Sequence, residues 1–408
     1  MSFYFSAYST PLLFGFVQGW VYAVLLWVRG RREERLSDVL LGWVLVALCF
    51  DIWIYMLGFG GIEIFWKQLE FFPRTLGWLL PPLVYFYLKS QFDTTFRLRV
   101  RDAWHVLPFV LDTAYHVLIW AQGPAFVRQW ENDVHNNGID DLEFIVGTGQ
   151  QFVYLYGSLQ LYRAYRVWIK TQFSEIDTIS FRWFRNFLIA LTITLTFSLM
   201  MTLIDLWLDL NYWQDWWGNL VGVLLIYYVS ITGYAQVQPG RRLTFRESDA
   251  SMVVGLAETA RPVEIQTGDP EKDKLLPAPP SPDMLKNRDN VLAYMTAERP
   301  YLEPELSLAD LARRIQTNPV TLSQVINAGV GKNFNDFVNE YRVGEFKRQV
   351  GDPANAHLSF LGIALDCGFN SKATFNRAFR KNTGLSPKEY AGTQKSPGNT
   401  TVGALFGS

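Results

Sequence analysis

The sequence predicts an all-α protein with two unlike parts: a seven-helix transmembrane bundle, followed by a cytoplasmic all-α domain with two helix-turn-helix motifs. Seven apolar stretches fill the first 240 residues, and most are near the ~20 residues that a spanning helix needs. All 15 tryptophans lie at or before Trp217, whereas the last third of the chain is polar. Regions that differ so much in composition are expected to fold in different solvents. We therefore expect a membrane domain at residues 1–240, a linker at 241–283, a second folded domain at 284–392 and a disordered tail at 393–408.

Each apolar stretch is interpreted as one helix. The third is short and contains Pro81 and Pro82, which a spanning helix tolerates when its neighbours satisfy the freed carbonyl groups. Tryptophan and tyrosine gather near the ends of the stretches, as they do at membrane interfaces. No basic residue precedes the first stretch, so we expect no cleaved signal peptide. The stretches run over Pro11–Val28, Asp38–Gly58, Arg74–Lys89, Trp104–Gln122, Leu142–Tyr165, Phe184–Leu208 and Gly218–Gln236.

The charges of the loops predict the orientation. Lysine and arginine are concentrated in the first, third and fifth loops and after the last stretch, whereas the other loops are poor in them or acidic. Positive loops stay in the cytoplasm, so the N-terminus should lie outside the inner (cytoplasmic) membrane and residues from 240 onward inside the cell. A soluble helical core is the alternative, but its helices would carry charges along their polar faces rather than in alternate loops.

The predicted linker separates the two parts. Residues 241–283 are rich in proline and in acidic side chains, and such a segment buries too little apolar surface to fold. A coil of ~40 residues spans ~35 Å on average, so the domain that follows could reach a partner while the chain stays anchored. The tail at 393–408 is rich in glycine, serine and threonine and is expected to be disordered.

The first helix-turn-helix is predicted after an opening helix over Asp283–Glu298. Ser307 and Asp310 fit a capping box, and Gln316–Asn318 forms the turn. Pro319 is well placed at the first position of the second helix, which is expected to end near residue 327. That helix presents on its outer face Val320, Thr321, Ser323, Gln324 and Asn327.

The second helix-turn-helix is predicted about fifty residues further on. The longer helix between the two motifs has one apolar face, made of Phe334, Phe337, Val338 and Tyr341. Gly368 allows the turn, Asn370 or Ser371 can cap the next helix, and Gly384 is placed to end it. The buried stripe of that helix, at i, i+3 and i+4, consists of Phe375, Ala378 and Phe379. Its outer face carries Lys372, Asn376, Arg377, Arg380 and Lys381.

These two motifs resemble the DNA-binding domain of AraC-type (AraC/XylS family) transcription regulators. The resemblance covers residues 285–391 and includes Leu308–Ala312, Phe337–Arg342, Ile363-Ala364 and the run from Gly368 to Tyr390. It implies two short recognition helices, joined by a long helix, that enter successive major grooves on one face of double-stranded DNA. Gly362 and Ala391 depart from the family, which usually has an acidic residue and an arginine at these positions.

Carried over by position, the resemblance also implies which side chains read DNA. The first recognition helix would use Val320, Ser323 and Gln324. The second would use Lys372, Asn376 and Arg377. Arg380 would lie nearer the phosphates, and we expect Lys381 to meet phosphate as well, because such contacts supply much of the affinity for DNA.

The predicted membrane helices contain acidic residues that are costly in lipid. Asp51, Asp112 and Asp205 fall in the second, fourth and sixth stretches, and His116 shares a helix face with Asp112 at i, i+4. These groups could line a signal-sensing pocket or a conformational relay, or they could only hold helices together; the sequence leaves both open. No pair of its four histidines has metal-ligand spacing, and its two cysteines are far apart, so we expect no metal site and no cofactor.

Together these features predict a membrane-anchored, sequence-specific transcription regulator, and not an enzyme, that couples a signal at the membrane to gene expression. The expected partners are double-stranded DNA, the lipid bilayer, a second copy of the chain, RNA polymerase and a small-molecule or membrane signal. An integral-membrane enzyme or transporter, whose helix-turn-helix domain serves regulation or protein contacts, is the alternative. Transport is disfavoured because the sequence shows no evident internal repeat.

Overall fold

The computed structural model describes residues 3–64, 69, 71–176, 182–208, 212–214, 216–236, 245, 282–355 and 357–394. Within these residues the chain forms helices and no sheet, which confirms the predicted all-α class. The predicted linker and tail lie almost entirely outside them. The chain divides into two compact units, Met1–Arg163 with Phe181–Glu247, and Ala164–Ser180 with Ser248–Ser408.

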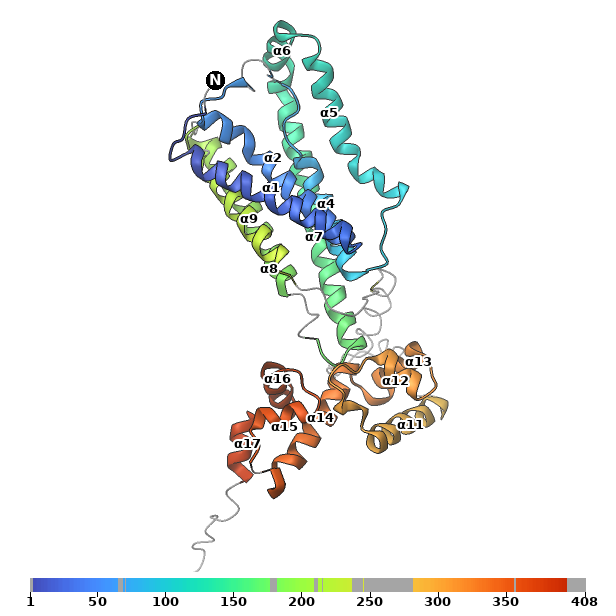
Figure 1. Ribbon diagram of the computed structural model, residues 1–408. Coiled ribbons are helices and arrows are strands. Elements are labelled where there is room, and N and C mark those ends of the chain that lie inside the picture. Colours follow the sequence, from blue (N-terminus) through green and yellow to red (C-terminus); the bar gives the residue numbers. More distant parts are fainter. Residues whose placement is uncertain are drawn as a thin grey trace, which may run out of the picture. The chain divides into compact units, whose positions relative to one another are not determined.

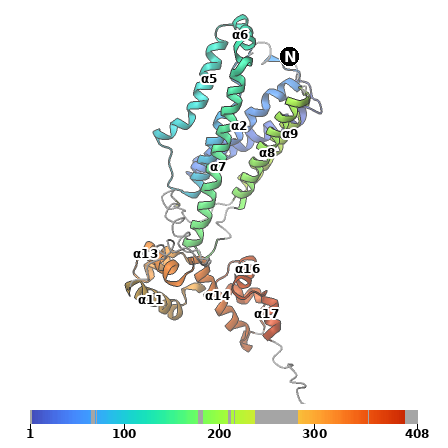
Figure 2. The ribbon, with the colours of Figure 1, turned by 180° about the vertical axis from the view of Figure 1, so that it is seen from behind.

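The first unit is a helical bundle (Figures 1 and 2). Each of the seven predicted apolar stretches contains a helix, and α6 is an additional short helix after α5. The helix α7 begins in the first unit, and its last residues, from Ala164 onward, belong to the second. The helices are α1 (Ser9–Arg32), α2 (Leu36–Phe59), α4 (Leu80–Phe92), α5 (Leu107–Trp120), α6 (Pro124–Trp130), α7 (Asp140–Gln172), α8 (Arg182–Leu208) and α9 (Trp216–Tyr234).

Four helices of the described residues are long and apolar enough to cross a membrane, namely Ser9–Arg32, Leu36–Phe59, Trp183–Asp205 and Trp216–Tyr234. In the third of these only 11% of the most apolar stretch is buried by the protein, so a long apolar surface is left uncovered. Helices α4 and α5 have 13 and 14 residues, because proline fixes the start of each and a 3₁₀ turn precedes it. The count of seven spans is therefore not confirmed and stays a prediction.

Helix α1 packs against both α2 and α9. Gly19 leaves room for side chains of both neighbours, because an added Cβ would lie 2.3 Å from the Sγ atom of Cys49 and 3.0 Å from the Cγ2 atom of Ile226. At the end of α1, Arg29 donates through Nε to Asp38 at 2.7 Å and through Nη1 to the carbonyl oxygen of Tyr234 at 2.7 Å. One guanidinium group thus fastens the ends of three helices.

The second unit contains the two predicted motifs. The helices agree closely with the predicted ranges, and Phe334 begins the long helix between the motifs. They are α11 (Pro282–Glu298), α12 (Leu308–Arg314), α13 (Pro319–Gln324), continued by a π-helical turn (Val325–Val330), α14 (Phe334–Val350), α15 (Phe360–Asp366), α16 (Lys372–Thr383) and α17 (Pro387–Gln394).

Two hydrophobic cores lie on the long helix α14. Its first half contributes Phe337 and Val338 to a core with α11, α12 and α13. Its second half contributes Val343 and Phe346 to a core with α15 and α16. Each helix-turn-helix therefore has a core of its own, and α14 is the rigid element that both cores share.

Candidate nucleic-acid interface

The first helix-turn-helix is built by two caps and a sharp turn. The Ser307 hydroxyl accepts the amide hydrogen of Asp310 at 3.2 Å, which starts α12. Gln316 takes φ = 57° between the helices, a left-handed conformation that reverses the chain. The Asn318 side chain then accepts the amide hydrogen of Thr321 at 2.7 Å and starts α13. The predicted cap at Ser307 and the predicted turn are confirmed, and the Asp310 carboxylate accepts from the Ser307 hydroxyl.

The predicted contact residues of α13 differ in exposure. Val320 and Gln324 are exposed, whereas Thr321, Ser323 and Asn327 are half-buried. The Asn327 amide donates to the Ser323 hydroxyl at 3.2 Å, so these two side chains are already engaged with each other. No charged residue occurs between Pro319 and Val330. This surface can make hydrogen bonds and apolar contacts, but it adds no positive charge.

The second helix-turn-helix depends on a close approach of two backbones. Gly368 takes φ = 90°, and a Cβ at this position would lie 2.5 Å from the carbonyl oxygen of Tyr301. Ser371, one of the two predicted caps, accepts the amide hydrogen of Thr374 at 3.2 Å. Helix α16 ends at Gly384, which has φ = 75° and donates to the carbonyl oxygen of Arg380 at 2.9 Å.

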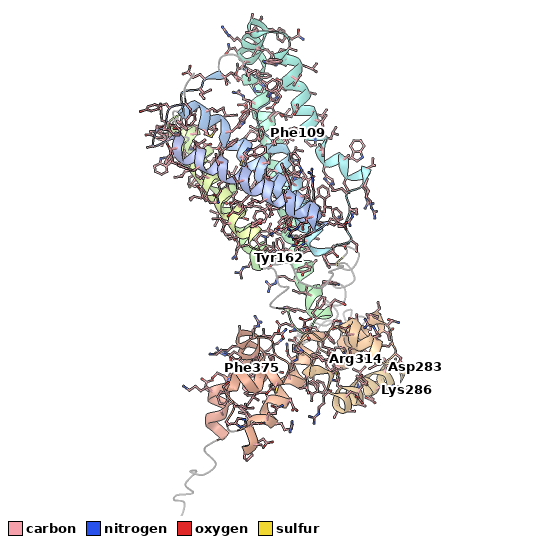
Figure 3. All side chains as sticks on the ribbon, in the orientation of Figure 1. Phe109, Tyr162, Asp283, Lys286, Arg314 and Phe375 are labelled. Carbon is pink, nitrogen blue, oxygen red and sulfur yellow. The ribbon has the colours of Figure 1, made fainter. Side chains whose placement is uncertain are left out.

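The outer face of α16 carries the candidate DNA contacts. Phe375, labelled in Figure 3, is buried with Ala378 and Phe379, as predicted. The opposite side chains are exposed, namely Lys372, Asn376, Arg377 and Arg380. The helix contains four basic residues and no acidic one. A positive, hydrogen-bonding face opposite a buried apolar face is what a helix needs to enter a DNA groove.

Lys381, the remaining predicted contact, lies beside the long helix. Its Nζ atom donates to both carboxylate oxygens of Asp336 at 2.6 Å, and the lysine side chain is 62% exposed. This ion pair joins α16 to the start of α14. A phosphate contact by Lys381 would therefore have to compete with Asp336.

A short segment that follows α7, here called the 173–175 segment (Phe173, Ser174 and Glu175), packs within the second unit. Phe173 forms an isolated antiparallel bridge with Ser307. The amide and the hydroxyl group of Ser174 both donate to the carbonyl oxygen of Leu306, at 3.2 Å and 2.6 Å. The segment thus lies against the chain just before α12.

The same segment contacts a buried polar face of α14. The Asn335 amide donates to the carbonyl oxygen of Ser174 at 2.6 Å, and Arg342 Nη2 donates to the Ser174 hydroxyl at 3.2 Å. Arg342 is fully buried and also donates to the carbonyl oxygens of Tyr301 and Glu303, each at 2.7 Å. Burial lowers the pKa of Arg342 to about 10, partly offset by the Glu175 carboxylate. Arg342 therefore remains a cation at neutral pH, and Glu175 supplies opposite charge.

Glu175 also contacts the second motif, because Thr374 in the first turn of α16 donates to its carboxylate at 3.4 Å. The 173–175 segment therefore contacts the start of the first motif, the long helix and the start of the second recognition helix. Sequence reasoning missed this arrangement. The sequence did contain a clue, because polar residues recur at i, i+4, i+7 and i+10 on one face of α14. All four are buried, namely Asn335, Asn339, Arg342 and Glu345.

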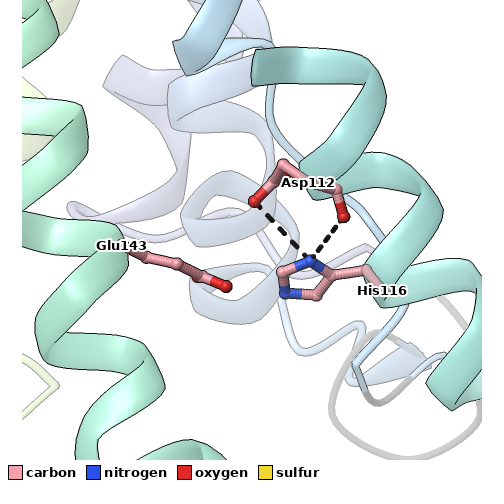
Figure 4. Close-up of side chains that lie close together, drawn as sticks. All are labelled: Asp112, His116 and Glu143. Carbon is pink, nitrogen blue, oxygen red and sulfur yellow. Dashed lines mark hydrogen bonds and ion pairs between the residues drawn. The ribbon is translucent and has the colours of Figure 1, made fainter. Parts of the chain in front are cut away.

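The four candidate sensing residues fall into two places in the first unit. Asp51 and Asp205 line one cavity of about 480 Å³. Asp112 and His116 lie elsewhere, with His116 Nδ1 3.7 Å from the nearer Asp112 carboxylate oxygen, so the predicted pair is present. The fold adds Glu143, from α7, to this pair (Figure 4). Glu143 could not be chosen from the sequence, because it lies 27 residues after His116 and belongs to another helix.

Comparisons with known proteins agree with the second unit. The family model described as a helix-turn-helix domain matches residues 311–393. The chain is 29% identical over 108 residues to the uncharacterized HTH-type transcriptional regulator YtdP of Bacillus subtilis, which covers 26% of this chain and 13% of that protein. It is 29% identical over 83 residues to the HTH-type transcriptional regulator Rv1931c of Mycobacterium tuberculosis, which covers 20% of this chain and 31% of that protein.

A solved structure of a protein of unknown function from Listeria innocua is 31% identical and covers 26% of this chain and 94% of its own, with a TM-score of 0.23. The chain spans less than a third of the length of the curated relatives it matches. The match to the family model, together with the two motifs described above, identifies residues 311–393 as a helix-turn-helix domain of the AraC type. The curated relatives that match this part of the chain are transcription regulators.

Proposed function

We propose that this chain is a membrane-anchored, sequence-specific transcription regulator whose recognition helices α13 and α16 bind double-stranded DNA. The observation that carries the proposal is the exposed face of α16, where basic and amide side chains stand opposite a buried apolar stripe. Arg377 is suited to a bidentate contact with guanine and Asn376 to one with adenine. Arg380 is assigned to phosphate, and Gln324 and Ser323 of α13 to base edges in the neighbouring groove.

The anchoring part of the proposal rests on the first unit. Its helices include four that are long and apolar enough to span a bilayer, and much of their apolar surface is left uncovered by protein. The basic loops favour an external N-terminus and a cytoplasmic DNA-binding domain in the inner membrane. A second copy of the chain and RNA polymerase are the partners that such a regulator would need.

The coupling part of the proposal rests on α7. This helix has 33 residues, which corresponds to about 50 Å of continuous helix. Glu143 lies near its start, and the 173–175 segment follows its end and contacts both helix-turn-helix motifs. A signal that shifts or rotates α7 would move this segment and change the spacing of α13 and α16. DNA affinity depends on that spacing, because both helices must fit successive grooves.

The experiment is selection of duplexes from a random pool by the purified full-length chain in lipid nanodiscs. We expect one enriched sequence, and Arg377→Ala should weaken its binding by about 1–3 kcal/mol and relax preference at one base position. The control is the variant Lys286→Ala, which changes an exposed lysine on α11 and should bind the selected duplex as the unaltered chain does. Equal affinity for the selected and scrambled duplexes would contradict the proposal, as would substrate turnover or flux without specific DNA binding.

A further inference from the structure

We propose that Asp112, His116 and Glu143 form a binding site for a divalent transition-metal cation of the zinc type. The site combines one imidazole and two carboxylate groups from α5 and α7 (Figure 4). It is separate from the DNA-binding face. Whether it binds metal does not depend on the function proposed above.

The positions of the three side chains support a shared ligand. One ring nitrogen and one oxygen from each carboxylate all lie within 4.8 Å of one another. Ligand atoms around zinc, each ~2.0–2.2 Å from the metal, lie about 3.3–3.6 Å apart. The longest separation must shorten by roughly 1 Å, which rotation of a carboxylate group provides.

The environment of His116 favours one orientation of its ring. The Phe71 ring stacks on it, with centroids 4.7 Å apart and planes 28° apart. His116 Nδ1 lies 3.0 Å from the carbonyl oxygen of Asp112. A proton on Nδ1 would be donated to this carbonyl and leave the lone pair on Nε2, the nitrogen that faces Glu143 in Figure 4. Such a carbonyl–histidine contact is the usual outer support of a metal-binding imidazole.

Charge provides the second argument. The side chains of Asp112 and His116 are 16% and 17% exposed, so the carboxylate groups of Asp112 and Glu143 approach each other with limited solvation. Two such carboxylate groups repel each other. A divalent cation bound between them removes this repulsion and replaces the water molecules that would otherwise solvate them. An imidazole with two carboxylate groups suits zinc, manganese or ferrous iron better than calcium, and three protein ligands leave a position for water.

A second histidine and a cavity lie beside the three side chains. His135 is buried, its Nδ1 lies 3.2 Å from the Tyr115 hydroxyl oxygen, and its ring centroid is 6.0 Å from that of His116. A cavity of about 290 Å³, lined by Glu143 and Trp78, provides room for a hydrated ion to approach.

The experiment measures metal binding by the purified full-length chain in nanodiscs. Zn²⁺ is titrated in competition with a chromophoric chelator, and Co²⁺ is used as a spectroscopic probe. We expect one saturable equivalent per chain that excess Ca²⁺ and Mg²⁺ do not displace. The Co²⁺ complex should show the visible absorption bands of a low-coordinate N/O site. Asp112→Asn and Glu143→Gln, which preserve side-chain size, should each weaken Zn²⁺ binding at least about tenfold.

Asp141→Asn is the matched control, because Asp141 is an exposed acid on the same turn of α7. It should bind Zn²⁺ as the unaltered chain does. The proposal is wrong if the unaltered chain shows no saturable Zn²⁺ binding, or if the amide variants bind Zn²⁺ as well as it does while eluting as the same monodisperse species. It is also wrong if Asp141→Asn weakens binding as much as Glu143→Gln, since the metal would then be held by surface acids in general.

Discussion

Replacing Glu175 by glutamine tests whether the 173–175 segment holds the DNA-binding unit together. The substitution preserves the shape and the contact with Thr374 but removes the negative charge near buried Arg342. Arg342 keeps its hydrogen bonds to the carbonyl oxygens of Tyr301 and Glu303, yet loses its opposite charge. The guanidinium group is fully buried and therefore poorly solvated, which lowers its pKa to about 10.

The expected cost follows from these contacts. Breaking a buried ion pair costs about 3–5 kcal/mol when one charge is left without any partner. Because the carbonyl oxygens of Tyr301 and Glu303 still accept hydrogen bonds from Nε and Nη2 of Arg342, we expect a cost of about 2–3 kcal/mol. At 1.4 kcal/mol for each factor of ten, local opening should become roughly 30- to 150-fold more frequent.

Hydrogen exchange of the full-length chain, followed by mass spectrometry, measures that opening. Peptides from α14 and from the first turn of α16 should exchange faster in Glu175→Gln, whereas peptides from α1 and α2 should not change. Glu340→Gln is the control, because it breaks an exposed pair with Lys332 on another face of α14, which is worth at most about 1 kcal/mol. If Glu175→Gln exchanges no faster than Glu340→Gln, the segment does not stabilise the unit.

Three further outcomes are expected. Burial lowers the pKa of His135, so protonation of this ring destabilises the folded state. Residues 131–139 should therefore lose protection from hydrogen exchange as the pH falls below about 6.5. The variant His135→Gln should lose this pH dependence, whereas a variant of the exposed His357 should keep it. Topology reporters fused after His135 should behave as external and those fused after Gln172 as cytoplasmic; a cytoplasmic residue 135 would reverse the orientation. Arg380→Ala should weaken binding to all duplexes equally and reduce the slope of log affinity against log salt concentration by about 1. Gln324→Ala should leave this slope unchanged and relax the sequence preference. A changed slope in Gln324→Ala would mean that this side chain contacts phosphate.

Much of the helical structure could be predicted because its causes are local. Ser307, Asn318 and Ser371 cap helices through atoms three residues away, and Gly384 ends α16 through a left-handed turn. The exposed face of α16 followed from the periodic burial of its apolar residues, since a helix with one buried face leaves the opposite side chains outside. The pairing of Asp112 with His116 followed from their spacing of four residues.

The remaining features depend on contacts between distant parts of the chain. Glu143 joins Asp112 and His116 only because the fold brings the start of α7 near α5, which the spacing of residues within one segment cannot reveal. The Asn335 amide donates to the carbonyl oxygen of Ser174, which is 161 residues away in the sequence. The polar residues on one face of α14 were therefore visible in the sequence, but their partner was not. Hydropathy marks the apolar stretches, whereas Pro81, Pro82 and Pro108 fix the starts of the shorter helices that form within two of them.

The central claim is that a chain held in the membrane recognises a particular DNA sequence. Mapping the genomic DNA that is crosslinked to the full-length protein in cells, with the protein recovered from the membrane fraction, tests it most directly. The account predicts a small set of sites that share one sequence with two elements about one helical turn apart, and loss of those sites in the double variant Gln324→Ala, Arg377→Ala. Crosslinking that is spread evenly over the genome, or that is unchanged in the double variant, would contradict it.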